Sequence, residues 1–565
     1  MCGIYCCIRH LPSPTPVHVP SDEIERLLRQ RGPDHFGIVK EEIEPHGGEK
    51  KEKVSITLAA SVLALRRGED GEPVQQPLYL PNDQGILCWN GEAWKYDGQI
   101  IAEPDTTFIA ARLAEVSNTR DLDAQAFHRL TLEVLGRIRG PFALIYWNKA
   151  RNVVYFGRDC VGRRSLVQAV TGNGGLVLSS VPDFSMASEW AEADADGIYS
   201  INLDEFNRDA TNGLESCITR TPYSNASING ELSIPVPWPA LNTTLPPTTS
   251  PPKRLHTASP AVDTLLSELK QSMALRLAPR SLALNDTPIA ILFSGGLDCT
   301  LLARLAHDIL PPSTPIDLLN VAFENPRIHK TTSEVNGNAE LGSDIYETCP
   351  DRLTARQSHA ELSSVCPARE WRLLRINIPY TESSSHREKV LRLIHPHNTE
   401  MDLSIAMALY FASRGPTAAR VLFSGLGADE LFGGYQRHAL AWKRGGYRGL
   451  LGELALDTER LGKRNLGRDD RVTARWGREV RYPFLDEGVV ARAMRAGIEE
   501  KVGFGFGFEA GGEDGVELDD KSVLRLIAKK LGMSKVATEK KRAIQFGSRS
   551  AKMESGRTKG TMKIG

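Results

Sequence analysis

The chain has 565 residues, which is too long for one hydrophobic core, so we expect two domains or more. Charged residues make up 25% of it and hydrophobic residues 41%, as in an ordinary soluble globular protein. The net charge of −1 gives no argument for nucleic acid or an anionic membrane as a partner. No apolar run approaches the ~20 residues that span a bilayer, so no membrane segment is expected.

The nine cysteines are scattered, and the first residues contain no apolar signal-peptide segment. This predicts reduced thiols and a cytoplasmic location rather than a disulfide scaffold or a zinc site. Removal of Met1 would leave Cys2 with a free α-amine. Because an α-amine titrates at about pH 7.7–8.0, Cys2 would then combine a nucleophile and a base in one residue.

The first 170 residues carry several short motifs. An amphipathic helix is expected from Ser21 to Gln30, with Ser21 as its N-cap, and RGPD follows it at 31–34. WNGE stands at 89–92, and its Asn-Gly pair alone would be typical of a hairpin turn. The motifs that follow or flank these are QPL at 76–78, EPDTTFIAARL at 103–113, RGPFALIYWN at 139–148 and FGRDCVGRRSL at 156–166.

Between about 218 and 256 the composition changes to Pro, Thr and Ser, which predicts an extended linker. A helical pattern resumes from Ala261 to Leu277. Residues 504–516 read as a flexible glycine-rich insertion. The tail after Gly556 is basic, and we expect it to be disordered.

Residues 288–300, PIAILFSGGLDCT, predict a buried strand over 289–293, a glycine turn and a helix over 297–309. Strand, glycine turn and helix together form a phosphate site, because the free N–H groups at the helix start favour an anion. No Lys-Ser or Lys-Thr follows, so it is not a Walker A loop. Asp298 is suited to a magnesium ion that bridges phosphates.

A second copy of this design follows at 419–430, ARVLFSGLGADE, where the acids are Asp429 and Glu430. Both turns would lie at the carboxyl ends of parallel strands, where ligands bind. Two such turns can face one magnesium pyrophosphate from both sides. Between the two turns, CPDRLTAR at 349–356 places Asp351 as a further acid, and a helix is expected within 397–415, capped by Thr399 and Asp402.

Together these motifs resemble the glutamine-dependent asparagine synthetases over nearly the whole chain. VRYPFLD at 480–486 and KSVLR at 521–525 are similar to two further segments of that family. NLGRDDRV at 465–472 and KRAIQFGSRSAKME at 541–554 are closer to one branch, the asparagine synthetase domain-containing proteins.

The resemblance implies a fold and a domain order. It implies a class II glutamine amidotransferase domain of four α-β-β-α layers at 2–215 and a linker at 216–256. An α/β ATP-pyrophosphatase-type synthetase domain with a parallel sheet would follow at 257–550, with a basic tail at 551–565. The implied substrates are glutamine, aspartate and ATP with Mg²⁺, with no nucleic acid or membrane partner, and a homodimer stays open.

The resemblance also assigns roles to particular residues. In the amidotransferase half, Cys2 would be the nucleophile, Asn90 and Gly91 the oxyanion hole, and Asp105 the partner of the glutamine α-amine. Arg66 and Arg67 are both candidates for the glutamine carboxylate. In the synthetase half, the ATP and pyrophosphate residues would be Ser294, Gly295, Gly296, Asp298, Val321 and Gly425, with Asp298 and Asp429 as metal ligands and Lys521 stabilising developing charge.

The chain departs from the family pattern in three places. Leu426 stands where the synthetases have an acid tied to adenylation and amination, and a leucine cannot accept a proton. Cys299-Thr300 replaces Ser-Ser, and Cys299 is the weaker hydrogen-bond partner for phosphate. Ser165 replaces a proline, which we interpret as a structural difference.

Three hypotheses therefore stay open. The first is a glutamine-hydrolysing asparagine synthetase that forms AMP and pyrophosphate through a β-aspartyl-adenylate. The second is a glutamine amidotransferase that acts on another carboxylate. The third is a synthetase-dead member kept for protein interaction, which Leu426 favours and the retained Cys2 set opposes.

Overall fold

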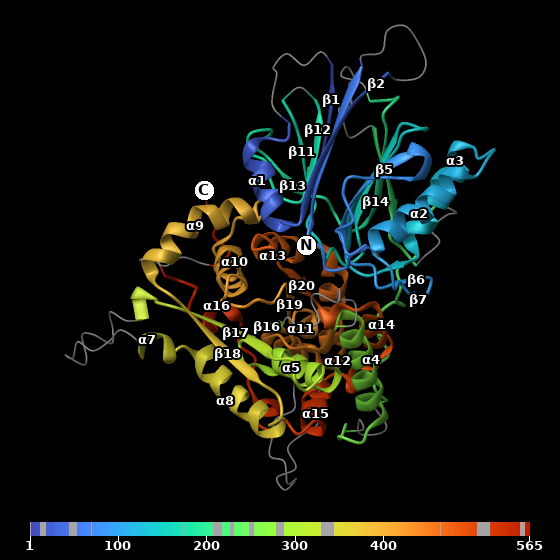
Figure 1. Cartoon of the computed structure of the whole chain (residues 1–565). Helices are drawn as coiled ribbons and strands as arrows, with labels where there is room; N and C mark the ends of the chain where they lie inside the picture. The colour runs from blue at the N-terminus through green and yellow to red at the C-terminus, as the bar shows by residue number, and fades with distance from the viewer. Residues whose placement is uncertain are drawn as a thin grey trace.

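A computed structural model of the chain describes residues 2–11, 19–44, 53–68, 70–172, 174–206, 217–225, 231–247, 254–277, 288–328, 344–463, 465–504, 520–553 and 560–564. Figure 1 shows two halves, with the sheets of the first above the helices and sheet of the second. Strand β1 begins at the junction between them, so the start of the chain lies against both halves (Figure 1).

The first half is built on two antiparallel six-stranded sheets. In spatial order, the first sheet contains β13 (Ala191–Glu192), β11 (Val167–Val170), β12 (Leu176–Ser179), β1 (Gly3–His10), β3 (Val54–Val62) and β2 (His35–Ile43). The second contains β15 (Ile218–Pro222), β14 (Gly197–Asn202), β10 (Val153–Arg158), β9 (Phe142–Asn148), β5 (Gly85–Gly91) and β4 (Leu78–Tyr79). A small third sheet joins β7 (Gln99–Ile100), β6 (Lys95–Tyr96) and β8 (Ile138–Arg139).

Alternation along β1 explains how these sheets stack. Ile4, Cys6 and Ile8 point into the core between the two sheets, whereas Tyr5 and Cys7 pack on the side of helix α1 (Asp22–Arg31). Successive side chains of a strand point to opposite faces, so one strand serves both layers. Helices α2 (Asp105–Asn118) and α3 (Ala124–Gly136) cover the outer face of the second sheet. The four-layer α-β-β-α fold expected from the resemblance is confirmed.

The second sheet extends into the stretch expected to be a linker. Strand β15 (Ile218–Pro222) pairs with β14, and Tyr223 forms a further bridge with Ile234. The sheet therefore ends several residues beyond position 215, inside the linker range of 216–256. Asn242 also contacts the second half, because its backbone N–H donates to the carbonyl of Met494 over 2.8 Å.

The described residues of the second half form a five-stranded parallel sheet. Its spatial order is β18 (Trp371–Ile378), β17 (Ile316–Phe323), β16 (Ile289–Leu292), β19 (Val421–Phe423) and β20 (Glu479–Arg481). The helices around it are α4 (Pro260–Leu277), α5 (Leu297–Ile309), α7 (Asp344–Glu347), α8 (Pro350–Val365), α9 (Tyr380–Ile394), α10 (Glu400–Ser413), α11 (Ala428–Phe432), α12 (Gln436–Glu459), α13 (Leu466–Ala474), α14 (Glu487–Arg495), α15 (Ser522–Lys530) and α16 (Ile544–Gly547).

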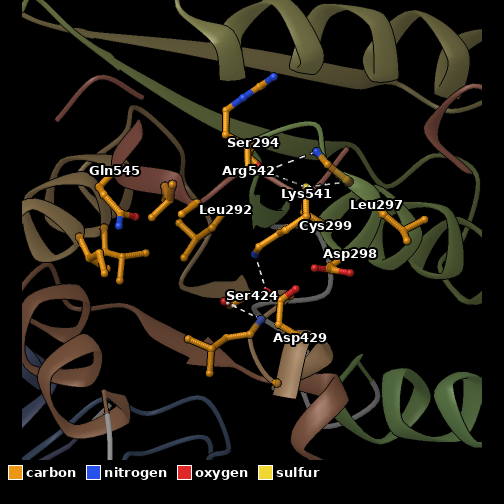
Figure 2. Close-up of a pocket in the computed structure, with 18 of the residues that line it drawn as sticks. Leu292, Ser294, Leu297, Asp298, Cys299, Ser424, Asp429, Lys541, Arg542 and Gln545 are labelled. Carbon is orange, nitrogen blue, oxygen red and sulfur yellow. Dashed lines mark hydrogen bonds and ion pairs between the residues drawn. The ribbon is translucent and has the colours of Figure 1, made fainter. Parts of the chain in front are cut away.

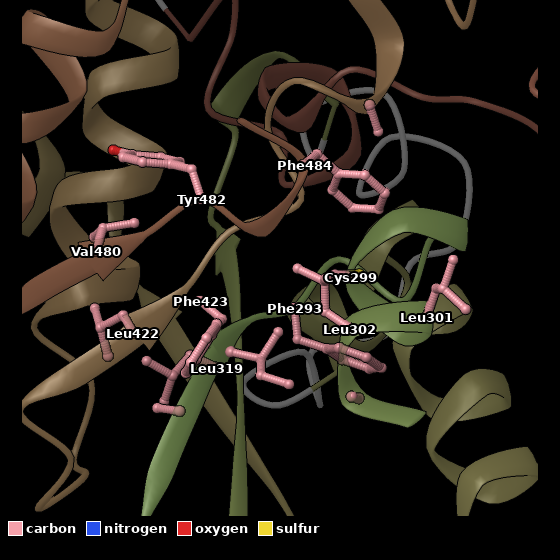
Figure 3. Close-up of a cluster of buried hydrophobic side chains, with 14 of the residues drawn as sticks. Phe293, Cys299, Leu301, Leu302, Leu319, Leu422, Phe423, Val480, Tyr482 and Phe484 are labelled. Atoms are coloured by element: carbon pink, nitrogen blue, oxygen red, sulfur yellow. The ribbon is translucent and has the colours of Figure 1, made fainter. Parts of the chain in front are cut away.

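Helices cover both faces of this sheet, with α8 on one side and α10 on the other (Figure 1). Figure 3 shows the apolar core near the carboxyl ends of the central strands, where Phe293, Leu319 and Phe423 lie beneath the two turns. The predicted α/β domain with a parallel sheet is confirmed, and both glycine turns leave neighbouring strands at the same edge.

The local helix signals were also predicted well. Helix α1 has Ser21 as its N-cap, whose hydroxyl accepts from Ile24 N–H over 3.2 Å. Helix α10 has Thr399 in the same role. Most of the glycine-rich stretch 504–516 lies outside the described residues.

The basic tail is partly ordered, contrary to the expectation of disorder. Residues 560–564 pair with the start of α10, where Thr399 and Lys563 form an antiparallel bridge. Ile564 N–H donates to Asn398 over 2.7 Å and Glu400 N–H to Met562 over 3.0 Å. These backbone bonds were not predictable from composition, which records only charge. Among the described helices, none is long and apolar enough to cross a membrane.

Candidate functional site

Cys2 lies directly before β1 and is buried, with 9% of its surface exposed. The backbone carbonyl of Cys2 accepts a hydrogen bond from Nε of Arg31 over 3.2 Å. Arg31 is the first residue of the RGPD motif, so this motif holds the backbone of Cys2 in place. Burial raises the pKa of the Cys2 thiol to about 11. A thiol in this state is protonated at neutral pH, so it needs a base to act as a nucleophile.

Asn90 and Gly91 form the end of strand β5 rather than a hairpin turn. Asn90 is fully buried, and neither its Nδ2 nor its Oδ1 has a hydrogen-bond partner among the described residues. A Cβ at Gly91 would lie 2.7 Å from the carbonyl oxygen of Pro141, so only glycine fits there. A buried amide without a partner is costly and indicates a group that a ligand satisfies.

Asp105 begins α2, and its Oδ2 accepts from Trp89 Nε1 and from Ala93 N–H, both over 2.8 Å. Burial raises the pKa of this carboxyl, while the charge of Arg66 works in the opposite direction. The structure therefore separates the two arginine candidates. The Arg66 side chain is buried and pairs with Glu92 close enough for its charge to act on Asp105, whereas Arg67 donates to the carbonyl of Gly71 in a loop over 3.0 Å.

Glu92 belongs to the same site, although it was not assigned a role from the sequence. Its carboxylate is buried, 3.2 Å from Arg66 Nε and 3.6 Å from Arg481 of the other half. Burial raises the pKa of Glu92 to about 7, and the two arginines offset only part of that shift. Its position directly after the Asn-Gly pair was the available signal. Arg481, in contrast, is 389 positions away along the sequence.

In the second half, the two glycine turns meet closely. Gly295 has φ +82°, and a Cβ there would lie 2.3 Å from the backbone nitrogen of Ala355. A Cβ at Gly425 would lie 2.7 Å from the Cβ of Asp298. Because β16 and β19 are neighbours, these glycines let the second turn approach the first turn of α5.

The two acids from these turns share one ammonium group. Lys521 Nζ lies 2.6 Å from Asp298 Oδ2 and 2.5 Å from Asp429 Oδ1, and Lys541 also pairs with Asp429. Figure 2 shows Asp298 and Asp429 together at one end of the cavity, with Lys541 reaching toward Asp429.

The charges of this cluster are strongly interdependent. Burial raises the pKa of Asp298, aided by repulsion from Asp429. Burial also opposes the ionisation of Asp429, but the ammonium groups of Lys521 and Lys541 outweigh it and hold its pKa below the usual range. Burial alone would lower the pKa of Lys521, yet the two carboxylates hold it well above its ordinary value.

The acidic pair fits a magnesium ion of the kind that also binds substrate phosphates. Asp298 Oδ1 is buried without a hydrogen-bond partner in the described part of the chain. Mg²⁺ is usually held by one or two carboxylates together with phosphate oxygens. A complete protein cage is not needed, and no cluster of three or more candidate ligands occurs among the described residues.

A cavity of about 480 Å³ opens over the two turns. Its walls include every described ATP-site candidate except Gly295 and also contain Leu426 and Cys299. Leu426 packs against the apolar core, and its N–H donates to Ser424 Oγ over 3.3 Å. The Cys299 thiol donates to the carbonyl of Gly296 over 3.3 Å, so it stabilises the turn itself.

Two further residues of this cavity were not assigned roles from the sequence. Burial raises the pKa of Asp351 to about 7, and Arg542 and Lys541 offset the shift only in part. Lys541 contacts Asp429 from a segment 112 residues downstream. Next to the cavity, His438 is fully buried, and its Nε2 lies 2.9 Å from Asp457 Oδ2.

Buried ion pairs connect the two halves. Arg31 Nη2 lies 2.7 Å from Asp470 Oδ2, and Arg164 Nη2 lies 3.2 Å from Glu479 Oε2. Ser165, at the position where the family has proline, donates its N–H to Asp470 over 3.1 Å and accepts from Arg471 over 2.8 Å. The site around Cys2 is therefore held partly by the second half of the chain.

Comparison with known proteins agrees with this architecture. The profile described as "Glutamine amidotransferase domain" matches residues 1–216, and the one described as "Asparagine synthase" matches 269–455 and 443–562. The human asparagine synthetase domain-containing protein 1 is 29% identical over 661 residues, covering 100% of this chain and 97% of the relative. A Drosophila melanogaster asparagine synthetase domain-containing protein is 32% identical over 607 residues, covering 98% of both chains.

The Saccharomyces cerevisiae asparagine synthetase domain-containing protein is 30% identical over 523 residues, covering 88% of this chain and 84% of the relative. Both halves of the chain thus match in one order, and all three of these relatives are named as asparagine synthetase domain-containing proteins. The chain belongs to the glutamine-dependent asparagine synthetase family, in the branch of the asparagine synthetase domain-containing proteins.

Proposed function

We propose that the chain hydrolyses glutamine at Cys2 and uses the ammonia to amidate a carboxylate that it activates with ATP, aspartate being the acceptor. The products would be asparagine, glutamate, AMP and pyrophosphate. The observation that carries the proposal is the meeting of the two glycine turns at Asp298 and Asp429 on one lysine, in a chain whose other half buries both Cys2 and the unpartnered amide of Asn90.

In the amidotransferase half, the Cys2 thiol attacks the side-chain carbonyl of glutamine. Since burial raises the thiol pKa to about 11, the α-amine of a processed Cys2 takes the proton and passes it to the leaving ammonia. The Asn90 amide and the Gly91 N–H stabilise the oxyanion, which accounts for an amide that is otherwise unsatisfied. Asp105 and Arg66 hold the α-amine and α-carboxylate of the substrate.

In the synthetase half, the acceptor carboxylate attacks the α-phosphate of ATP, and pyrophosphate leaves toward the first turn. The Ser294 hydroxyl and the N–H groups at the start of α5 bind pyrophosphate oxygens. Val321 lies in the same cavity, where the resemblance places backbone contacts to adenine. A magnesium ion held by Asp298 and Asp429 would neutralise phosphate charge. Lys521, freed from one carboxylate, would stabilise charge on the reacting phosphate.

Leu426 favours a second candidate, in which the same machinery amidates a different carboxylate. The leucine lines the cavity and offers neither a charge nor a proton acceptor. An acceptor recognised differently from aspartate would account for the change.

An assay of the full chain tests the proposal. Glutamate, AMP and asparagine are followed with glutamine, ATP, Mg²⁺ and aspartate, and a Cys2→Ala variant serves as control. The proposal expects all three products, and it expects asparagine formation by Cys2→Ala only when ammonium is supplied. Glutamate release without aspartate-dependent AMP would contradict aspartate as the acceptor, and the absence of every product would contradict the enzyme.

A further inference from the structure

Asp469 is a buried carboxylate that the proposed chemistry has not yet used. It lies on α13 and is 2% exposed. Arg468 Nε donates to its Oδ1 over 2.8 Å, but its Oδ2 is buried without a hydrogen-bond partner among the described residues. Burial raises the pKa of Asp469, and the charge of Arg468 works in the opposite direction. Leaving one oxygen of a buried carboxyl unsatisfied is costly, so such an oxygen indicates a missing partner.

Asp469 lines the same cavity as Asp298, Asp429 and Leu426. The missing partner can therefore be a molecule bound in that cavity. The neighbouring Arg468 does not supply it, because its guanidinium is divided between Asp469 Oδ1 and Asp402 Oδ1, the latter over 2.6 Å.

The hydroxyl of Tyr482 does not supply the missing partner of Asp469 Oδ2 either. Burial, together with Asp469 and Asp470, keeps the pKa of Tyr482 well above its usual value, so the hydroxyl is neutral. Figure 3 shows this hydroxyl turned away from the labelled apolar side chains of the core. It has no hydrogen-bond partner of its own in the described ranges.

We propose that Asp469 binds the protonated amine of the acceptor, so that the molecule adenylated in this cavity is an amino acid and not a simple carboxylic acid. The inference rests on the proposed function of the same cavity. In the synthetases, an acid stands at the turn position that Leu426 occupies here. In this chain Asp469 would supply the negative charge of the cavity from α13 instead. An ammonium group satisfies the free oxygen with a charge-assisted hydrogen bond.

The test measures acceptor-dependent exchange of labelled pyrophosphate into ATP by the full chain. This half-reaction requires neither glutamine nor ammonia, so it isolates acceptor binding. Aspartate is compared with succinate, which lacks only the amine. The Asp469→Asn variant keeps the size of the side chain, and Asp402→Asn removes the other carboxylate from Arg468 without changing the wall of the cavity.

We expect wild-type exchange with aspartate and little with succinate. Asp469→Asn should raise the half-saturating aspartate concentration about tenfold or more, while the value for ATP and the glutaminase rate stay within twofold. Asp402→Asn should leave the aspartate value within twofold, which separates amine binding from mere support of Arg468.

Three other outcomes would overturn the inference and can be told apart. If Asp469→Asn leaves exchange with aspartate unchanged, the role of Asp469 alone is overturned. The same holds if the variant changes only the ammonium concentration that the complete reaction requires. Wild-type exchange with succinate as good as with aspartate also overturns it. Exchange with neither acid overturns the proposed function together with the inference.

Discussion

The amide of Asn90 is the residue-scale feature that bears most directly on the chemistry of the first half. Both of its polar atoms are buried without partners in the described part of the chain, beside a glycine that no larger residue can replace. Burying such an amide without a partner costs free energy in the unliganded protein. The amide is useful where negative charge develops during a reaction.

We therefore predict that Asn90→Ala lowers the glutaminase kcat about 10²–10³-fold with little change in KM. Removing an oxyanion donor weakens the transition state more than the bound substrate. Ammonia-dependent amidation should continue at the wild-type rate and serves as the control. An unchanged kcat for glutamine hydrolysis would remove Asn90 from the site.

Asp351 gives a prediction for stability against pH. Burial raises its pKa from 3.8 to about 7 in the folded chain, so the folded state holds the proton more tightly than the unfolded state. Between these two values the free energy of unfolding falls with rising pH, by up to about 1.4 kcal/mol per unit. Above about pH 7 the loss is complete.

Asp351→Asn removes this dependence. Without nucleotide, we expect the variant to gain about 2–3 kcal/mol relative to wild type on going from pH 5 to pH 8. Thermal unfolding at the two pH values measures the difference. A shift in midpoint that is the same at both values would show that the carboxyl is not held neutral by burial.

At the scale of elements, the two strand–turn–helix units position the acidic pair. Their contact depends on Gly425, where a Cβ would meet the Cβ of Asp298 at 2.7 Å. Gly425→Ala should therefore push the second turn away from α5 and lower pyrophosphate exchange about 100-fold, since displacements near 1 Å have costs of this size. Glutaminase activity should persist.

Gly452→Ala is the matched control, because a Cβ there would meet nothing within 4 Å. It should leave pyrophosphate exchange unchanged. If Gly425→Ala retained full exchange, the turns could not need the close approach that the structure shows.

The glycine turns were predictable from sequence because strand, turn and helix are contiguous, and each carries its own pattern. The different environments of Arg66 and Arg67 were not predictable, since adjacent residues share every local signal and only folding separates their partners. The places of Glu92, Asp469 and Lys541 in the sites were not predictable, because their partners or cavities are formed by segments that are distant in the sequence. The order of residues 560–564 was not predicted, because composition does not show which backbone segments pair.

At the scale of the whole molecule, buried charges join the amidotransferase half to the synthetase half. Buried ion pairs are costly to desolvate, and losing one partner leaves the other uncompensated. Ser165 connects to this network through both its N–H and its hydroxyl, which a proline could not do.

We predict that Ser165→Pro lowers the free energy of unfolding by about 2–4 kcal/mol, because Asp470 and Arg471 each lose a buried hydrogen bond. Ser165→Ala should lose only the bond to Arg471 and cost less. Chemical unfolding followed by tryptophan fluorescence compares the three proteins. Equal stability of wild type and Ser165→Pro would show that these bonds do not contribute to the contact between halves.

The central claim is that one chain transfers nitrogen from glutamine to a carboxylate activated by ATP. The most direct measurement supplies amide-¹⁵N glutamine, ATP, Mg²⁺ and aspartate to the full chain in the presence of unlabelled ammonium. The account predicts asparagine with ¹⁵N in its amide, together with equal amounts of AMP, and no labelled product from Cys2→Ala. Asparagine without ¹⁵N, or glutamate released with no aspartate-dependent AMP, would contradict it.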